Sequence, residues 1–303
     1  MSRHNPKGRD INGIVLLDKD TGLSSNAALQ KVKRLFFAKK AGHTGSLDPL
    51  ASGILPICLG QATKVAQFLL DDDKRYFVRG KLGENTDTYD CEGVVIKTQP
   101  FKQLDQNEIM AVALSFKGDI LQVPPMYSAL KKDGQPLYKL ARKGIEIERP
   151  ARPITIHDIN FICYEQGVMT LDVSCSKGTY IRSLIQDIGD KLGCGAHVIE
   201  LRRIGFAHLD ISETIKFCEL EALVTEDYQQ LDAHISPSEN MLPNIQDASL
   251  DTQQTIDIKF GRAVQSDQLG EQHMVKLFGP DHEFLGVGEL SKDGVIAPKR
   301  LFV

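Results

Sequence analysis

Long apolar runs, paired cysteines and a secretory leader are all missing from this sequence. No run approaches the roughly 20 apolar residues that a membrane-spanning helix needs, so we expect no membrane association. The N-terminus lacks the apolar segment of a secretory signal, which predicts a cytoplasmic protein. The six cysteines never occur at CxxC spacing, and we expect reduced, structural thiols rather than a zinc site or disulfides.

The composition is that of a globular protein with an uneven distribution of charge. The 303 residues, 42% hydrophobic and 25% charged, are enough for one large domain or two. The net charge of −4 conceals nine cations against three anions in residues 1–45, and one cation against eleven anions in residues 205–258. The basic end is a candidate phosphate-binding surface. For Lys31, Lys33 and Arg34 taken alone, we favour a solvated helix face.

Hydrophobic periodicity predicts both strands and helices along the first 250 residues. We expect strands over 13–19, 54–59, 76–82, 168–175 and 197–206. We expect helices over 25–37, 61–70, 108–116, 180–192 and 218–224. This mixture indicates an α+β domain.

Two further segments differ in character from this domain. Residues 124–152 combine many lysines and arginines with six prolines and glycines, which is typical of an inserted, irregular segment rather than a core element. Residues 251–303 contain short apolar runs separated by turn residues, which predict a small β-barrel. We therefore expect a domain over residues 1–250, with 124–152 inserted in it, followed by a small β domain over 251–303.

The most informative residue is Asp48, which lies in the glycine-rich stretch Gly42–Gly53. Glycines and a following proline favour a tight loop in which Asp48 is extended. A metal would need more ligands than the nearby His43, and a glycosidase would need a second catalytic carboxylate. The acidic run 71–73 is more typical of a surface turn. An aspartate that only bonds its own loop remains the alternative, but within this loop we favour a carboxylate that acts directly.

Arg182 is the expected partner of Asp48. It lies early in a predicted helix, where a cation is unfavourable next to the helix dipole unless it has a specific partner. A guanidinium paired with a carboxylate would hold it ionised and oriented. We therefore predict contact between the Asp48 and Arg182 side chains.

Five other residues are candidates for binding a flat ligand or RNA. Tyr76 could stack on a base and accept or donate a proton, or it could be a half-buried strand tyrosine. Tyr180 and Leu201 could line an apolar pocket, although each taken alone is more typical of a core. Lys64 could contact a phosphate or be solvated. His43 flanks the Asp48 loop and could stack into the gap left by a displaced base.

Four segments together resemble the catalytic segments of the bacterial tRNA pseudouridine-55 synthases. The first is Gly-His-Thr-Gly-Ser-Leu-Asp-Pro-Leu-Ala-Ser-Gly at 42–53, and Lys-Arg-Tyr at 74–76, Pro-Met-Tyr-Ser-Ala-Leu-Lys at 125–131 and Ser-Lys-Gly-Thr-Tyr-Ile-Arg-Ser-Leu at 176–184 follow in the expected order. The resemblance runs from about residue 11 to the C-terminus. Ser46 and Ser52 stand where Thr or Ala is common, and we expect activity to survive both.

The resemblance implies a fold, a reaction and a role for each site residue. It implies a mixed, largely antiparallel central sheet with flanking helices and a C-terminal PUA-like domain. It implies a monomer that isomerises uridine 55 in the T-arm stem-loop of tRNA, with base flipping and with no metal or cofactor. Asp48 would be the essential catalytic residue. The substrate-binding residues would be His43, Lys64, Tyr76, Tyr180, Arg182 and Leu201.

Two other classes of function compete with this enzyme. A non-catalytic RNA-binding or RNA-folding protein on the same scaffold would not need Asp48, and a dual role in modifying and remodelling tRNA is a variant of it. A small-molecule hydrolase using Asp48 would act without RNA and fits the basic N-terminal segment poorly.

Overall fold

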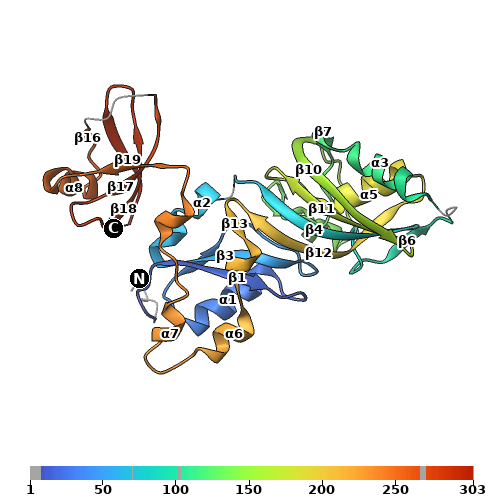
Figure 1. Ribbon diagram of the computed structural model, residues 1–303, viewed down its shortest axis with the longest axis horizontal. Coiled ribbons are helices and arrows are strands. Elements are labelled where there is room, and N and C mark those ends of the chain that lie inside the picture. The colour runs from blue at the N-terminus through green and yellow to red at the C-terminus, as the bar shows by residue number, and fades with distance from the viewer. Residues whose placement is uncertain (1–7, 70, 101–103, 267–270, 303) are drawn as a thin grey trace.

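The computed structural model describes residues 8–69, 71–100, 104–266 and 271–302. A large twisted sheet with helices forms most of the molecule, and a small second sheet lies at one end (Figure 1). The predicted α+β class is confirmed. Within the described residues, no helix is long and apolar enough to cross a membrane. All six cysteines are free, as expected.

The large sheet is mixed and largely antiparallel. Its strand order is β14-β1-β3-β12-β4-β11-β10-β7, with β2 added to β3 and β13 to β12. The strands are β1 (Gly13–Lys19), β2 (Ala41–His43), β3 (Ser52–Leu59), β4 (Lys74–Leu82), β7 (Gly118–Gln122), β10 (Arg152–Glu165), β11 (Val168–Cys175), β12 (Ala196–Phe206), β13 (Leu209–Asp210) and β14 (Ile215–Lys216). The pairs β1–β14 and β3–β12 are parallel, and the others are antiparallel.

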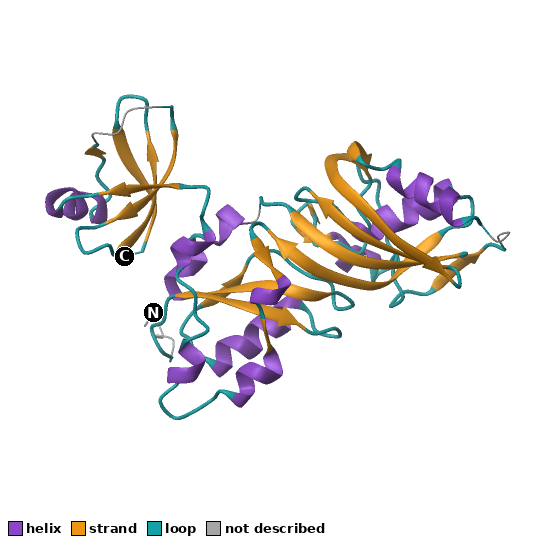
Figure 2. Cartoon of the chain, viewed as in Figure 1, coloured by secondary structure: helices purple, strands orange, loops and turns teal. Residues whose placement is uncertain are grey.

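Helices pack near both ends of this sheet (Figure 2). They are α1 (Ser25–Leu35), α2 (Ala66–Leu69), α3 (Gln106–Leu114), α4 (Leu137–Ala141), α5 (Ile181–Lys191), α6 (Phe217–Ala222) and α7 (Gln229–Asp232), with 3-10 turns η1 (Gly60–Lys64), η2 (Ile211–Glu213) and η3 (Ser238–Met241). Helix α5 buries the predicted apolar stripe, including Leu184, Ile185 and Ile188. Burying such a stripe stabilises a helix far more than its intrinsic propensity does.

The predicted strands of the first domain and most of its helices are confirmed to within a few residues. Helix α1 begins where expected, because the side chain of Ser24 accepts a hydrogen bond from the Ala27 N–H at 3.2 Å. The expected continuous helix over 61–70 is wrong, since the chain forms η1 and then a single turn, α2; Leu70 lies outside the described residues.

The second sheet has the order β15-β17-β18-β19-β16. Its strands are β15 (Gln246–Ser249), β16 (Val264–Gln265), β17 (His273–Phe278), β18 (Phe284–Leu290) and β19 (Val295–Leu301). Its curled shape fits a PUA-like domain (Figure 1). The sheet includes β15, which precedes the expected boundary at residue 250. It is also accompanied by the helix α8 (Thr252–Lys259), which was not expected in this segment.

Two small hairpins lie beside the large sheet. The first pairs β5 (Glu84–Thr86) with β6 (Val95–Thr98), and the second pairs β8 (Lys131–Lys132) with β9 (Gln135–Pro136). The second hairpin and α4 belong to segment 124–152, which otherwise has little regular structure, as its prolines and glycines predict.

Gly53 allows the parallel strands β3 and β12 to meet just beyond the Asp48 loop. Its φ is +102°, and a Cβ at this position would lie 2.2 Å from the backbone oxygen of Arg203. Backbone cannot move aside as the end of a flexible side chain can. Glycine is therefore required here for two reasons, the positive φ and the close approach.

We expect Gly53→Ala to lower the free energy of unfolding by roughly 2–4 kcal/mol, through backbone strain and the contact with Arg203. Gly118→Ala is the matched control, because Gly118 has a φ of +105° but nothing within 4 Å of its Cβ position. Urea unfolding of both variants separates the two causes. Equal losses in the two variants would contradict the role of the close approach.

Candidate active site

The loop that carries Asp48 is held in place by residues around the start of α1. The buried hydroxyl of Ser25 accepts a hydrogen bond from the Leu47 N–H at 2.7 Å and donates one to the Leu47 carbonyl at 3.0 Å. The Gly22 N–H donates to the Pro49 carbonyl at 2.8 Å. The loop is therefore anchored on both sides of Asp48, which fixes the position of its carboxylate.

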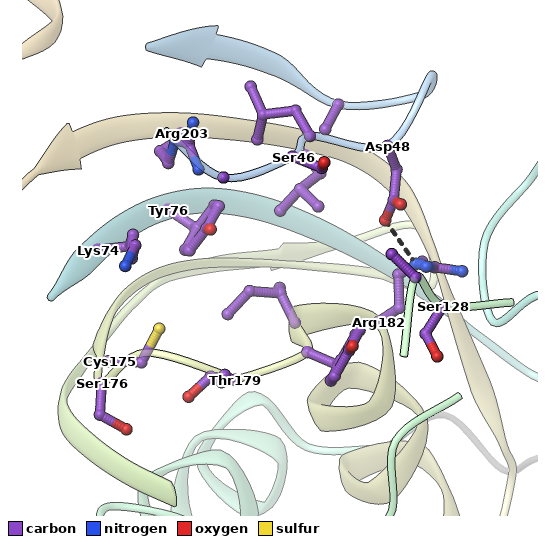
Figure 3. Close-up of a pocket in the computed structure, with 18 residues that line it drawn as sticks. Ser46, Asp48, Lys74, Tyr76, Ser128, Cys175, Ser176, Thr179, Arg182 and Arg203 are labelled. Carbon is purple, nitrogen blue, oxygen red and sulfur yellow. Dashed lines mark ion pairs between the residues drawn. The ribbon is translucent and has the colours of Figure 1, made fainter. Parts of the chain in front are cut away.

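The predicted contact between Asp48 and Arg182 is confirmed. Arg182 Nε lies 2.8 Å from Asp48 Oδ2 (Figure 3). The guanidinium is almost completely buried and has three more partners: Nη1 donates to the Thr88 carbonyl at 2.8 Å and lies 3.3 Å from Asp90 Oδ2, and Nη2 donates to the Tyr127 carbonyl at 2.8 Å. Arg182 thus joins Asp48 to two other chain segments.

The environment of Asp48 acts on its ionisation in two opposite ways. The cavity walls withdraw the carboxyl from bulk water, which raises the pKa of Asp48, and the Arg182 guanidinium opposes that shift. About 40% of the Asp48 side chain remains accessible, whereas only 4% of Arg182 is. The carboxylate can therefore reach a ligand while its counter-ion stays inside the protein.

Asp48 and Arg182 lie at the wall of a cavity of about 310 Å³. The same cavity is lined by Tyr76, Tyr180 and Leu201, so five of the seven predicted site residues come together (Figure 3). Tyr76 lies on β4, and Leu201 on β12, which is its neighbour in the sheet. Tyr180 precedes α5, and the buried amide of Gln122 bonds both its N–H and its carbonyl.

His43 lies at an adjoining cavity of about 640 Å³, which shares Asp48 and Arg182 with the first. Segment 124–152 contributes Tyr138 and Arg142 to this second cavity. Burial lowers the pKa of His43, which favours the neutral form of its imidazole.

The structure does not bring Lys64 to either cavity. Its ammonium donates to the carbonyl of Leu301, in β19 of the second sheet, at 2.6 Å. Val65, Val287 and Leu242 form a small apolar cluster at the same contact. Lys64 thus lies where the two sheets meet, and a role for it in substrate binding stays a prediction.

Three residues of the site are not among those predicted from the sequence: Asp90, Lys74 and Arg203. Asp90 is a buried second carboxylate on Arg182, and Lys74 and Arg203 line the 310 Å³ cavity. Lys74 belongs to the Lys-Arg-Tyr segment at 74–76, and Arg203 could have been found from its strand. Since neighbouring residues of a strand point to opposite faces, one of the pair Arg202 and Arg203 had to face the interior.

Tyr76 and Arg203 lie opposite each other on the antiparallel strands β4 and β12. Burial raises the pKa of the Tyr76 phenol, and the guanidinium of Arg203 opposes that shift. Within the described residues, no three His, Cys, Asp or Glu side chains gather as a metal ligand set.

The chain matches three models that together describe one family. The model of the TruB family pseudouridylate synthase N-terminal domain matches residues 33–181. The model of the tRNA pseudouridylate synthase B C-terminal domain matches 182–243, and that of the pseudouridine synthase II TruB C-terminal region matches 247–302.

Curated relatives match over nearly the full length. A tRNA pseudouridine synthase B of Mannheimia succiniciproducens is 52% identical over 303 residues, covering 99% of both chains. The protein of the same name from Shewanella sp. strain MR-4 is 50% identical over 305 residues, covering 98% of this chain and 96% of that one.

Solved structures support the fold. A Cbf5-Nop10-Gar1 complex contains a chain that matches with a TM-score of 0.72 and 25% identity, over 96% of this chain and 85% of that chain. An H/ACA RNP bound to a substrate RNA containing 2'-deoxyuridine matches with a TM-score of 0.71 and 21% identity, over 100% of this chain and 92% of that chain.

We expect Arg182→Met to lower the free energy of unfolding by roughly 3–5 kcal/mol, because it leaves two carboxylates and two carbonyls without their buried partner. Arg79→Met is the matched control, since Arg79 pairs with Glu200 at 3.3 Å on the surface and its loss should cost less than about 1 kcal/mol. Urea unfolding measures both. A loss for Arg182→Met no larger than that of the control would mean that the buried contacts contribute little.

Proposed function

Since this chain belongs to the TruB family of pseudouridylate synthases, we propose that it converts uridine to pseudouridine in tRNA. The observation that carries this proposal is the Asp48–Arg182 ion pair at the wall of a cavity large enough for a nucleoside. The relatives named tRNA pseudouridine synthase B support tRNA as the substrate.

The proposed target is uridine 55, presented by the T-arm stem-loop of tRNA. A stacked uridine cannot reach Asp48, so the nucleotide has to flip out of the RNA into the cavity. Flipping costs a few kcal/mol, and less in a loop than in a duplex. Two tyrosines and a leucine in the cavity wall support the entry of a flat, half-apolar base.

The reaction needs a carboxylate but neither a metal nor a cofactor. The C1′–N1 bond breaks, the uracil turns, and C1′ bonds to C5; C5 loses a proton and N1 gains one, so the composition is unchanged. Asp48 either adds to the nucleotide or removes a proton from the sugar. Both paths start from an ionised carboxylate, which the pair with Arg182 favours.

The other site residues hold the extruded nucleotide and the RNA around it. Tyr76 stacks on the uracil and takes the C5 proton, and Tyr180 and Leu201 enclose the base. His43 fills the gap that the displaced base leaves in the RNA loop. Lys64 contacts a phosphate near the second sheet.

The proposal extends to the two domains, the location of the protein and its oligomeric state. The catalytic domain comprises residues 1–250, and the basic segment 124–152 closes on the RNA. Residues 251–303 form a PUA-like RNA-binding domain, for which the curled second sheet is the support. The protein acts as a cytoplasmic monomer. RNA shape and phosphate contacts, more than base reading, select the substrate.

Tritium release from tRNA transcripts labelled at C5 of uridine tests the reaction and its catalytic residue together. We expect wild-type protein to release tritium from the T-loop position. Asp48→Asn should lose at least about 10³-fold in rate while binding tRNA within a few-fold of wild type, because it keeps the shape but not the charge of the side chain.

Asp71→Asn is the control, because Asp71 is an exposed carboxylate paired with Lys177 at 2.9 Å, outside the cavities. It should keep the wild-type rate. Tight tRNA binding without tritium release by the wild-type protein would contradict the enzyme and leave an RNA-binding protein on the same scaffold.

A further inference from the structure

Arg203 is a buried cation without a carboxylate partner. Only 2% of the residue is exposed, and it makes no ion pair within the part of the chain that the structure describes. Its Nε donates to the Ile54 carbonyl at 2.8 Å, while the buried Nη2 has no hydrogen-bond partner among the described residues. Burying a charge is costly unless it is compensated, so this arrangement calls for an explanation.

The other two arginines of the region are compensated in the usual way. Arg182 has two carboxylates and two carbonyls. Arg202, the neighbour of Arg203 in β12, points to the opposite face, where it lies 2.6 Å from Asp18 Oδ2. Arg203 alone among the three faces the 310 Å³ cavity without an anion beside it.

The two ends of the cavity differ in charge. Figure 3 shows Tyr76, Lys74 and Arg203 together on one side of the cavity and the Asp48–Arg182 pair on the other. The side chains of Lys74 and Arg203 both lie over the ring of Phe206, at 5.1 Å and 5.0 Å from its centroid. The end of the cavity at Tyr76 therefore carries two cationic side chains whose charged groups lie over an aromatic face.

Negative charge passes to the base during the proposed reaction. When the C1′–N1 bond breaks, its electron pair leaves with the uracil, whose two carbonyl oxygens share the charge. The pair is used again when C5 bonds to C1′, after which C5 loses its proton and N1 gains one. With the sugar at Asp48 and the base over Tyr76, the charged base lies toward Arg203.

We propose that Arg203 acts directly on the substrate in this reaction, and that its positive charge, which no carboxylate among the described residues compensates, stabilises the anionic uracil between cleavage and reattachment. The inference rests on the proposed function. A fixed positive charge in a cavity that holds little water is poorly screened, so it stabilises negative charge that develops nearby. Because the charge is already in place, the protein does not have to reorganise during the reaction. This role requires that no carboxylate pairs with Arg203, because such an anion would neutralise its positive charge before the substrate bound.

Single-turnover rates of three variants on tRNA transcripts test the proposal. Arg203→Gln removes the charge, and its rate should fall about 10²–10³-fold, the range seen when one stabilising donor is lost. Arg203→Lys keeps the charge and should stay within about 10-fold of wild type. Arg202→Met, the control on the opposite face, should change the rate less than about 3-fold. tRNA affinity should be preserved in all three.

A second substrate separates an electrostatic role from a structural one, in every variant that folds. Fluorine at C5 makes uracil a stronger acid, so its anion needs less help from the protein. With 5-fluorouridine at the target position, the loss caused by Arg203→Gln should shrink at least about 5-fold, measured as consumption of that nucleoside after nuclease digestion.

The outcomes are distinct. Equal losses on both substrates, or a Lys variant as slow as the Gln variant, would overturn the proposal and leave Arg203 as a structural link to Ile54. Wild-type activity in Arg203→Gln would also overturn it, with the proposed function intact. A wild-type protein that leaves uridine unchanged would overturn the proposed function itself.

Discussion

The ion pair between Asp48 and Arg182 is the interaction on which the arrangement of the site depends. A buried guanidinium has five N–H donors, and Arg182 makes four contacts with groups from three separate segments. These are the Asp48 loop, the turn that contains Thr88 and Asp90, and the start of segment 124–152 at Tyr127. Because all of them meet at one side chain of α5, the helix, the loop and the inserted segment have fixed positions relative to the large sheet.

The sheet supplies the other side of the cavity. Strands β4 and β12 present Tyr76, Leu201 and Arg203 in register, and Gly53 lets β3 approach β12 closely enough to place the Asp48 loop above them. One end of the cavity therefore has an anion with its counter-ion, and the other has Arg203, which makes no ion pair within the described residues. A ligand that carries negative charge on a flat ring, next to a sugar, fits this division of charge.

Local signals predicted much of this structure. The strands followed from runs and alternation of apolar residues, and α1 and α5 from helical periodicity. Helix α8 was missed, although Asp251 and Gln254 form a capping box at its start. The helix expected over 61–70 is interrupted because η1 and α2 pack against the second sheet through Val65 and Phe68, a contact that no local pattern contains.

The sequence predicted those site residues whose local sequence context was itself unusual. Asp48 stood out by its loop and Arg182 by its unfavourable place in a helix. Asp90 and Arg203 did not, because their importance comes from what surrounds them after folding. Asp90 shares the guanidinium of Arg182, and Arg203 has no paired carboxylate in the part of the chain that the structure describes. Lys64 was read as part of the site, yet it lies at the contact between the two sheets.

The central claim is that the cavity beside Asp48 receives an extruded uridine. Photo-crosslinking tests it directly, with 4-thiouridine at the target position of a tRNA transcript and mass spectrometry of the attached peptide. The account predicts attachment to the cavity wall at Tyr76, Tyr180 or Leu201, and its loss when unlabelled tRNA competes. Attachment only to residues 130–152 or to the second sheet would contradict it, because the target nucleotide would then bind outside the cavity.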